Sequence, residues 1–351
     1  MRSVLKACAF VAVASLLAGC RVEVSQSNVG RIVKTVLKTR RSSPSFSMDI
    51  QVWKGAGEAH EIVHCIIKKD RANTFSYAVR GGARYWSTPD GCVILGAGGE
   101  RAEVFSGLPE PTVDELREAL RWGASRFIDR HTITAHLFTR EGPWKGHRVN
   151  ITPRHPSPFD TRGEQFLDKR SRGKVLVTEY DEEGKISRRR LARSVRILRR
   201  GEFEIPGIPE CGVERFAPGR GRATAPAWAR EPVPVIEVLG DTRARHAEGL
   251  AVYDMSKDGF VFVLFERVAS EPLVTSGIAH TADIGGVTVS AWPIGEKFVY
   301  RWRDGGVEFS LLGNIPPDVA WEFLVANVGA GRALASRPAR SGSPEKAETA
   351  R

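Results

Sequence analysis

The chain lacks most of the patterns that mark enzymes and membrane-spanning proteins. Beyond its first twenty residues, no apolar run reaches the roughly 20 residues that a transmembrane helix requires. It has no glycine-rich phosphate loop and no regular alternation of strands with helices, which excludes a nucleotide-binding fold built on a parallel sheet. No nucleophile-elbow motif supports a serine-based catalytic triad. We therefore predict no catalytic residues and no cofactor.

Cysteine is also scarce, with five residues among 351. Cys8 and Cys20 lie in the N-terminal segment, and the spacings of Cys65, Cys92 and Cys211 fit no zinc site. In an oxidising compartment these three thiols allow one disulfide and one odd thiol, in any of three pairings. Buried free thiols are the alternative, and the sequence does not choose between the two.

The first twenty residues have the pattern of a lipoprotein export signal. Arg2 and Lys6 form a positive start, residues 7–19 form an uncharged apolar run, and Leu17-Ala-Gly-Cys20 has the small-residue pattern of a lipobox. In a lipobox the cysteine thiol is acylated and the bond before it is cut. We predict a mature chain that begins at Cys20 and is held in a membrane by its acyl chains. A plain secretory signal with an accidental cysteine is the alternative.

Export restricts the partners that the charge of the protein can meet. The chain has 52 Lys and Arg against 41 Asp and Glu, and loss of residues 1–19 would lower its net charge from +11 by two, to +9. A basic protein outside the cytoplasm meets anionic lipid head groups or an acidic partner rather than nucleic acid. Residue 21 is Arg and not the Asp that retains lipoproteins at the inner membrane of enteric bacteria, which favours the outer membrane.

The remaining pattern predicts an α+β protein of two domains. About 330 residues exceed one ordinary domain, and a hydrophobic content of 42% supports a real core. A Pro-, Gly- and Arg-rich stretch at 201–233 is predicted to be a linker, and residues 329–351 a disordered tail. Helices are expected at 24–41, 112–122 and 316–328. Strands are expected at 46–53, 62–68, 74–79, 84–87, 92–95, 132–139, 147–152, 174–180, 186–197, 260–267, 287–292, 297–304 and 307–312.

Four stretches carry a resemblance to a known family: the helix 24–41 with the strand after it, Gly146–Pro153, Phe166–Lys185, and Gly306–Ala326. Together they resemble the outer-membrane lipoprotein carrier and receptor (LolA/LolB-like) superfamily, in the two-domain form of the sigma-E regulatory proteins RseB/MucB. The resemblance implies a half-open antiparallel β-barrel wrapped around helices at 20–200. It further implies a smaller α+β domain at 234–328.

The resemblance also implies a binding protein and not an enzyme. Its apolar cavity would hold lipid or the acyl chains of other lipoproteins, in lipoprotein sorting or envelope homeostasis. The alternative is a periplasmic regulator whose C-terminal domain binds a segment of an anti-sigma factor. Apolar residues of the early strands are the candidates for the cavity lining, although an ordinary core would need the same residues. They are Phe46, Met48, Ile50, Val52, Phe75, Tyr77 and Trp86.

Seven arginines between residues 188 and 200, with no acidic residue among them, form a second candidate site. Alternating with apolar residues, they could press one face of a strand onto an anionic lipid surface. A solvated strand face is the competing interpretation. The candidates for this surface are Arg188, Arg189, Arg190, Arg193 and Arg196.

One motif supports a third, enzymatic hypothesis. His60-Glu61-Ile-Val-His64 matches the zinc-hydrolase pattern, in which two histidines on adjacent turns of a helix bind the metal. The β-branched residues around it favour a strand, on which positions 60 and 64 lie about 13 Å apart. No third ligand follows in the sequence. We therefore predict a strand and no metal at this position.

Overall fold

The computed structural model describes most of the chain between residues 21 and 329. The described residues are 21–34, 45–55, 61–67, 75–79, 84–88, 91–96, 99, 101–108, 113–171, 173–199, 212–217, 225–230, 232, 242–247, 249–257, 260–269, 273, 279–294 and 297–329.

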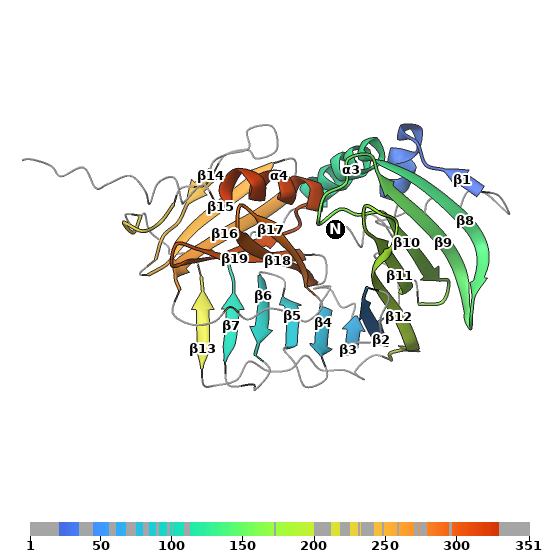
Figure 1. Cartoon of the computed structure of the whole chain (residues 1–351), viewed down its shortest axis with the longest axis horizontal. Coiled ribbons are helices and arrows are strands. Elements are labelled where there is room, and N and C mark those ends of the chain that lie inside the picture. Colours follow the sequence, from blue (N-terminus) through green and yellow to red (C-terminus); the bar gives the residue numbers. More distant parts are fainter. Residues whose placement is uncertain are drawn as a thin grey trace, which may run out of the picture.

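A single curved sheet of 13 strands forms the first part of the molecule (Figure 1). Its order is β1-β8-β9-β10-β11-β12-β2-β3-β4-β5-β6-β7-β13, and every pairing is antiparallel except β13 with β7. Consecutive strands mostly pair as hairpins, so local turns determine most of the order. The strands are β1 (Arg21–Glu23), β2 (Phe46–Lys54), β3 (Glu61–Ile67), β4 (Phe75–Val79), β5 (Arg84–Thr88), β6 (Gly91–Leu95), β7 (Ala102–Phe105), β8 (His131–Glu141), β9 (Trp144–Pro153), β10 (Gly163–Asp168), β11 (Lys174–Tyr180), β12 (Ile186–Ile197) and β13 (Val213–Phe216).

A second, seven-stranded antiparallel sheet forms the C-terminal part, in the order β14-β15-β16-β20-β19-β18-β17. Its edge strands, β14 and β17, are short. The strands are β14 (Thr242–Ala244), β15 (Ala251–Lys257), β16 (Phe260–Val268), β17 (His280–Ile284), β18 (Val287–Ile294), β19 (Lys297–Asp304) and β20 (Val307–Gly313).

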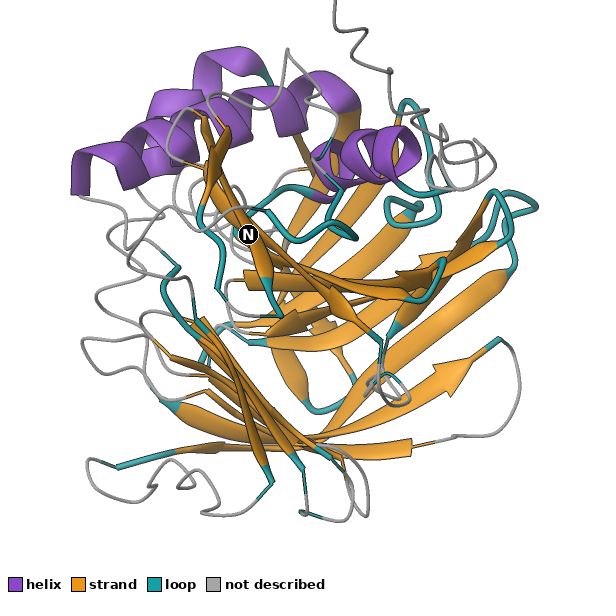
Figure 2. Ribbon diagram, turned by 90° about the vertical axis from the view of Figure 1, so that its left-hand side faces the viewer, coloured by secondary structure: helices purple, strands orange, loops and turns teal. Residues whose placement is uncertain are grey.

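The helices lie together along one side of the two sheets (Figure 2). They are the 3-10 turn η1 (Gln26–Asn28), α3 (Val113–Arg130) and α4 (Pro317–Asn327), and residues 29–34 are helical as well. Helix α3 joins the halves of the molecule, because it contacts β8 of the first sheet and β16 of the second. Among the described residues, no helix is both long and apolar enough to cross a membrane.

The two sheets bury their apolar faces against each other. One continuous core includes Ile50 of β2 and Phe105 of β7 from the first sheet, and Val263, Phe265 and Trp292 from the second. The rings of Phe105 and Phe265 meet edge to face with centroids 5.4 Å apart. A second core fills the space between the far face of the C-terminal sheet and α4. The C-terminal sheet is thus covered on both faces.

The predicted α+β class with a half-open, curved antiparallel sheet is confirmed. The prediction that 201–233 is only a linker was wrong. Within it, β13 pairs in parallel with β7, and the segment 225–230 packs its Trp228 against the second core. An arginine- and proline-rich composition concealed this strand, since its four residues pair with a neighbour more than 100 positions away.

Other differences concern the bounds of the elements. Helix α3 runs eight residues past its predicted end, and β1, β7, β14, β15 and β17 lie in stretches with no predicted strand. The predicted helix 24–41 begins at η1, and its residues 35–41 lie outside the described part of the chain. The predicted signal peptide and Cys20 also lie outside it, as does the predicted tail from residue 330 onward.

Candidate functional site

The inner face of the curved sheet is apolar where the sequence predicted a cavity. Phe46, Met48, Ile50 and Val52 alternate along β2 and are all buried. Cross-strand register continues this face through β3 and β4 to β5, where Tyr85 belongs to the same core. The C-terminal sheet covers this face, so the four residues of β2 are core residues here and not the walls of an open cavity.

Register separates the other cavity candidates into two groups. Phe75 and Tyr77 occupy positions of β4 on the same face as Phe46, although their side chains lie outside the described ones. The assignment of Trp86 to this cavity was wrong. It follows Tyr85 on β5 and therefore points to the opposite face, where it packs in a separate small cluster with Val93. Apolar character predicted its burial, but only the register determined its face.

A narrow cleft of about 50 Å³ opens between the curved sheet and the C-terminal domain, beside the second core. Its polar lining comes mainly from β10, β11 and β12 of the curved sheet, and its apolar lining mainly from the C-terminal domain. The lining residues are Phe159, Gln165, Lys174, Glu179, Arg190, His280, Ala291, Pro293, Phe298, Tyr300 and Pro317. The cleft therefore combines an apolar wall with a polar wall rich in basic groups.

Glu179 is the acidic centre of the cleft. Its carboxylate lies 3.4 Å from Nη2 of Arg190 on β12 and 3.3 Å from Nε2 of His280 on β17. The contact with His280 connects the two domains across the cleft. With Lys174 also in the lining, two permanently cationic side chains outnumber the single carboxylate, so this wall favours an anionic or strongly polar head group.

The predicted arginine surface is divided between the two faces of β12. Arg189, Arg193 and Arg196 are exposed, whereas Arg188 is buried and Arg190 turns into the cleft. Side chains alternate between the two faces of a strand, so Arg189 points away from the face of Arg188 and Arg190. The β-bulge between Ala192 and Ser194 shifts this alternation, and both Arg193 and Arg196 face solvent. The expectation that all five arginines share one surface was wrong, because a strand places adjacent residues on opposite faces.

A buried cluster of charges holds the two sheets together at the β7 side. Nη1 of Arg301 on β19 donates to Oε2 of Glu103 on β7 over 2.6 Å, and Arg301 also pairs with Glu308 of β20. Nη2 of Arg267 on β16 lies 3.0 Å from Oε1 of Glu308 and 3.4 Å from Oε1 of Glu103. All four side chains are under a tenth exposed. Two carboxylates and two guanidinium groups thus form the buried centre of a cluster whose partly exposed rim holds Arg101, Glu214 and Arg303.

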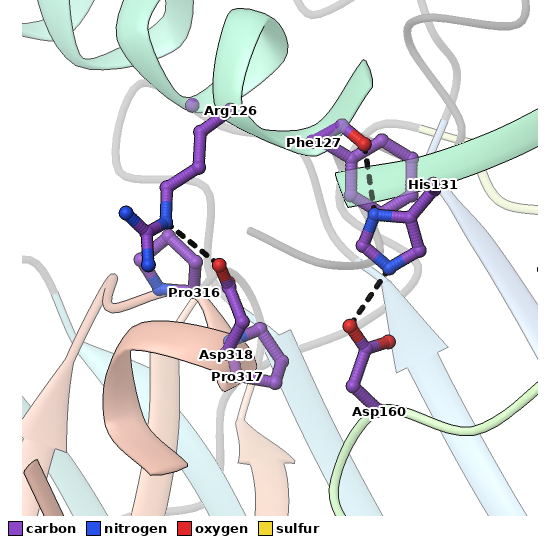
Figure 3. A pocket seen from close by; sticks show the side chains of 8 residues that line it. Arg126, Phe127, His131, Asp160, Pro316, Pro317 and Asp318 are labelled. Atoms are coloured by element: carbon purple, nitrogen blue, oxygen red, sulfur yellow. Dashed lines mark hydrogen bonds and ion pairs between the residues drawn. The ribbon is translucent and has the colours of Figure 1, made fainter. Parts of the chain in front are cut away.

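A second polar contact between the domains lies where α3 meets α4 (Figure 3). Nε of Arg126 donates to Oδ2 of Asp318 over 2.7 Å, and Arg130 pairs with Glu322 over 2.8 Å. These groups are partly exposed. Sequence inspection missed both inter-domain contacts because their partners are more than 190 residues apart along the chain.

His131 lines a small pocket together with Arg126 and Asp318, and it is buried at the start of β8. Its Nδ1 lies 2.8 Å from the carbonyl oxygen of Phe127, and its Nε2 lies 2.7 Å from Oδ2 of Asp160 (Figure 3). Both ring nitrogens of His131 thus face oxygen atoms. The pair connects the end of α3 to the loop before β10, and the pocket beside it is too small for a substrate.

The metal-binding motif does not have the geometry that it would need. Glu61 and His64 lie on β3, a strand, whereas the zinc pattern requires adjacent turns of a helix. His60 lies outside the described residues. In the described part of the chain, no group of three or more His, Cys, Asp or Glu is placed to hold a metal ion.

Cys92 is a buried free thiol, which decides between the two alternatives for that residue. Burial raises the pKa of its thiol to about 12, an effect that the charges of Lys297 and Arg301 only partly offset. For Cys65 the structure describes the backbone on β3 and not the side chain, and Cys211 lies outside the described residues.

No family model and no curated protein matches this chain. Solved structures do resemble it. MucB is 12% identical over 82% of this chain and 93% of its own, with a TM-score of 0.39. The complex of MucA with MucB from Pseudomonas aeruginosa matches at 15% identity over 83% and 95%, with a TM-score of 0.38. An outer membrane lipoprotein-sorting protein domain from Vibrio parahaemolyticus covers 51% of this chain and 95% of its own, at 10% identity and a TM-score of 0.26.

At TM-scores this low, no residue can be transferred from one structure to the other.

Proposed function

We propose that this protein is a lipoprotein, tethered to the membrane through Cys20, that binds the acyl chains of lipids or of other lipoproteins between its two sheets. The observation that carries the proposal is the composition of the inter-sheet cleft. Its apolar wall holds Phe159, Phe298 and Tyr300, and its polar wall holds Arg190 and Lys174. An amphiphile with an acyl chain and an anionic or ester head group matches both walls.

Burial of methylene groups supplies the affinity in this proposal. Each buried methylene contributes about 0.8 kcal/mol, so several carbons against the apolar wall suffice for binding without any chemical step. Phe159, Ala291 and Tyr300 of the apolar wall belong to the second core, which lies between the C-terminal sheet and α4.

The test measures lipid that purifies with the protein. The full mature chain, exported with an ordinary secretory signal and carrying Cys20→Ser, is purified without detergent and its bound lipid is quantified by mass spectrometry. We expect acyl lipid in near-stoichiometric amount, and at least about fivefold less with Phe298→Asp, because a charge in an apolar wall carries a desolvation cost above 1 kcal/mol.

Val268→Asp is the matched control, since it places the same charge at a side chain that is already 54% exposed. Lipid content equal in the Phe298→Asp and Val268→Asp proteins would reject the cleft as the binding site. Absence of lipid from the Cys20→Ser protein itself would reject acyl binding.

Binding of a periplasmic anti-sigma segment by the C-terminal domain is the second candidate function. The observation that favours it is the position of β17, which ends the seven-stranded sheet and, among the described strands, pairs with β18 alone. Such an edge can add a strand from an extended peptide. A photo-crosslinking residue at the exposed Thr281 should then capture a single-span inner-membrane protein in cells, and the same probe at Lys185 should not.

A further inference from the structure

The first strand of the mature chain starts directly behind the predicted anchor. Arg21, the residue after Cys20, pairs with His136 of β8, and Glu23 pairs with Thr134. Consecutive Cα atoms are 3.8 Å apart, so no flexible tether separates an acyl group on Cys20 from the edge of the curved sheet. An anchor at this residue would therefore hold the sheet edge against the bilayer surface.

The hairpin of β8 and β9 extends well past this point (Figure 1). Because β1 and β8 are antiparallel, β1 starts level with His136, whereas β8 continues to Glu141 and the turn lies at 142–143. At about 3.3 Å per residue, the hairpin tip projects on the order of 15 Å beyond the anchor. With the anchor at the bilayer surface, the tip meets or enters the same leaflet unless the whole sheet lies flat along it.

The residues of the tip match an interfacial position. Arg140, Pro143 and Lys145 are exposed, and Trp144 is partly buried, with part of its side chain packed against the core between the two sheets. Tryptophan concentrates at the boundary between head groups and acyl chains, and basic residues are attracted to anionic lipid. The acidic Glu141 in this turn pairs with Arg148, which reduces its repulsion toward anionic lipid.

Neighbouring turns at the same end of the sheet extend the basic surface. The backbone N–H of Lys169 donates to the carbonyl oxygen of Lys145 over 2.8 Å, which places the β10–β11 turn beside the hairpin. Lys169 and Arg170 in that turn are exposed. The carboxylate of Asp168 is occupied within the turn by bonds from Arg170 and Ser171.

We propose that the β8–β9 hairpin and the adjoining β10–β11 turn form a docking surface for the anionic leaflet that holds the acylated Cys20, with Trp144 at the level of the head groups. This proposal rests on the lipid anchor of the proposed function but not on acyl binding in the cleft. It assigns a fixed orientation to the tethered protein: the end of the curved sheet that carries the hairpin faces the membrane.

The experiment uses the full-length, acylated protein reconstituted in vesicles of phosphatidylethanolamine and phosphatidylglycerol with brominated acyl chains, which quench nearby tryptophan. The chain has eight tryptophans, and we expect Trp144→Phe to remove more than half of the quenching although it removes one emitter. Trp321→Phe, on α4, is the matched control and should leave the quenching unchanged. Equal quenching in the two variants would overturn the proposal.

Charge reversal gives an independent readout. Arg140→Glu with Lys145→Glu should lower the quenching at least twofold in vesicles that contain phosphatidylglycerol. Arg117→Glu with Lys185→Glu, which changes the net charge equally at exposed sites away from the hairpin, should not. Unaltered quenching in the hairpin variant would overturn the electrostatic part. A protein whose mass shows no lipid on Cys20 would overturn both the anchor and this surface, whereas an acylated protein with unquenched Trp144 would overturn the surface alone.

Discussion

Two of the polar contacts that join the domains differ mainly in their access to water. At the β7 side, Glu103 and Arg301 are fully buried. At the helical side, Arg126 and Asp318 have side chains 19% and 15% exposed, and the neighbouring Arg130 and Glu322 are about a third exposed. Both contacts are made of Arg and acidic side chains at hydrogen-bonding distance. Their chemistry is therefore the same, and their environment is not.

The difference in exposure determines how costly it is to remove one partner from each contact. In the buried cluster each charge carries a desolvation cost, which only its ion-pair partners offset. Removal of one partner therefore leaves an uncompensated charge in the core. In the exposed contact, water replaces a lost partner at little cost. We infer that the buried cluster selects the one alignment in which β7 faces β19 and β20, while the contact between α3 and α4 adds little.

The largest effect is expected from Glu103→Ala. The variant leaves the buried Arg301 and Arg267 short of a counter-charge and should lower the free energy of unfolding by about 3–5 kcal/mol. Chemical denaturation measures this loss. Glu214→Ala, which removes a 39% exposed carboxylate from the rim of the same cluster, should cost less than about 1 kcal/mol. Similar losses in the two variants would show that burial does not govern this contact.

Glu266 provides a further test of how burial affects a carboxylate. It is as buried as Glu103, but its hydrogen-bond donor is the backbone N–H of Arg230. Burial raises the pKa of Glu266 from 4.5 to about 7, which the hydrogen bond and the charge of Arg230 only partly offset. Between these two values the folded protein keeps a proton that the unfolded chain releases. The free energy of unfolding should therefore decline as the pH rises from about 4.5 to about 7.

Glu266→Gln tests this dependence, since the amide keeps the acceptor oxygen but carries no charge. At pH 8 the variant should be more stable than the wild type by roughly 2–4 kcal/mol, and near pH 4 the two should agree. Denaturation curves across this range measure the difference. A gain that does not change with pH would contradict the proposed cause.

The smallest effect is expected from Asp318→Asn at the helical contact. Loss of the ion pair with Arg126 should cost less than about 1 kcal/mol at low salt, and the difference from the wild type should vanish near 1 M salt because partly exposed charges are screened. A loss of unfolding free energy as large as that of Glu103→Ala would instead show that this contact is a main link between the two domains.

Local patterns predicted much of the first sheet. Alternation along 46–53 predicted β2 and its buried positions, and turn residues at 181–184 predicted the hairpin between β11 and β12. These features depend on neighbours in the sequence. The parallel strand β13 and the partners of Glu103 could not be predicted, because each depends on a segment about 100 to 200 residues away that leaves no local pattern.

The sequence by itself determined the strand-rich class, the buried positions of β2, and the export signal that we predict before Cys20. All three follow from short-range periodicity or composition, which the chain carries wherever it folds. Only the tertiary structure decided that Trp86 and Phe46 lie on opposite faces, that Arg190 points into a cleft while Arg189 does not, and that the C-terminal sheet covers the apolar inner face. These outcomes depend on register and on the packing of one sheet against another, where a shift of one residue exchanges the two faces of a strand.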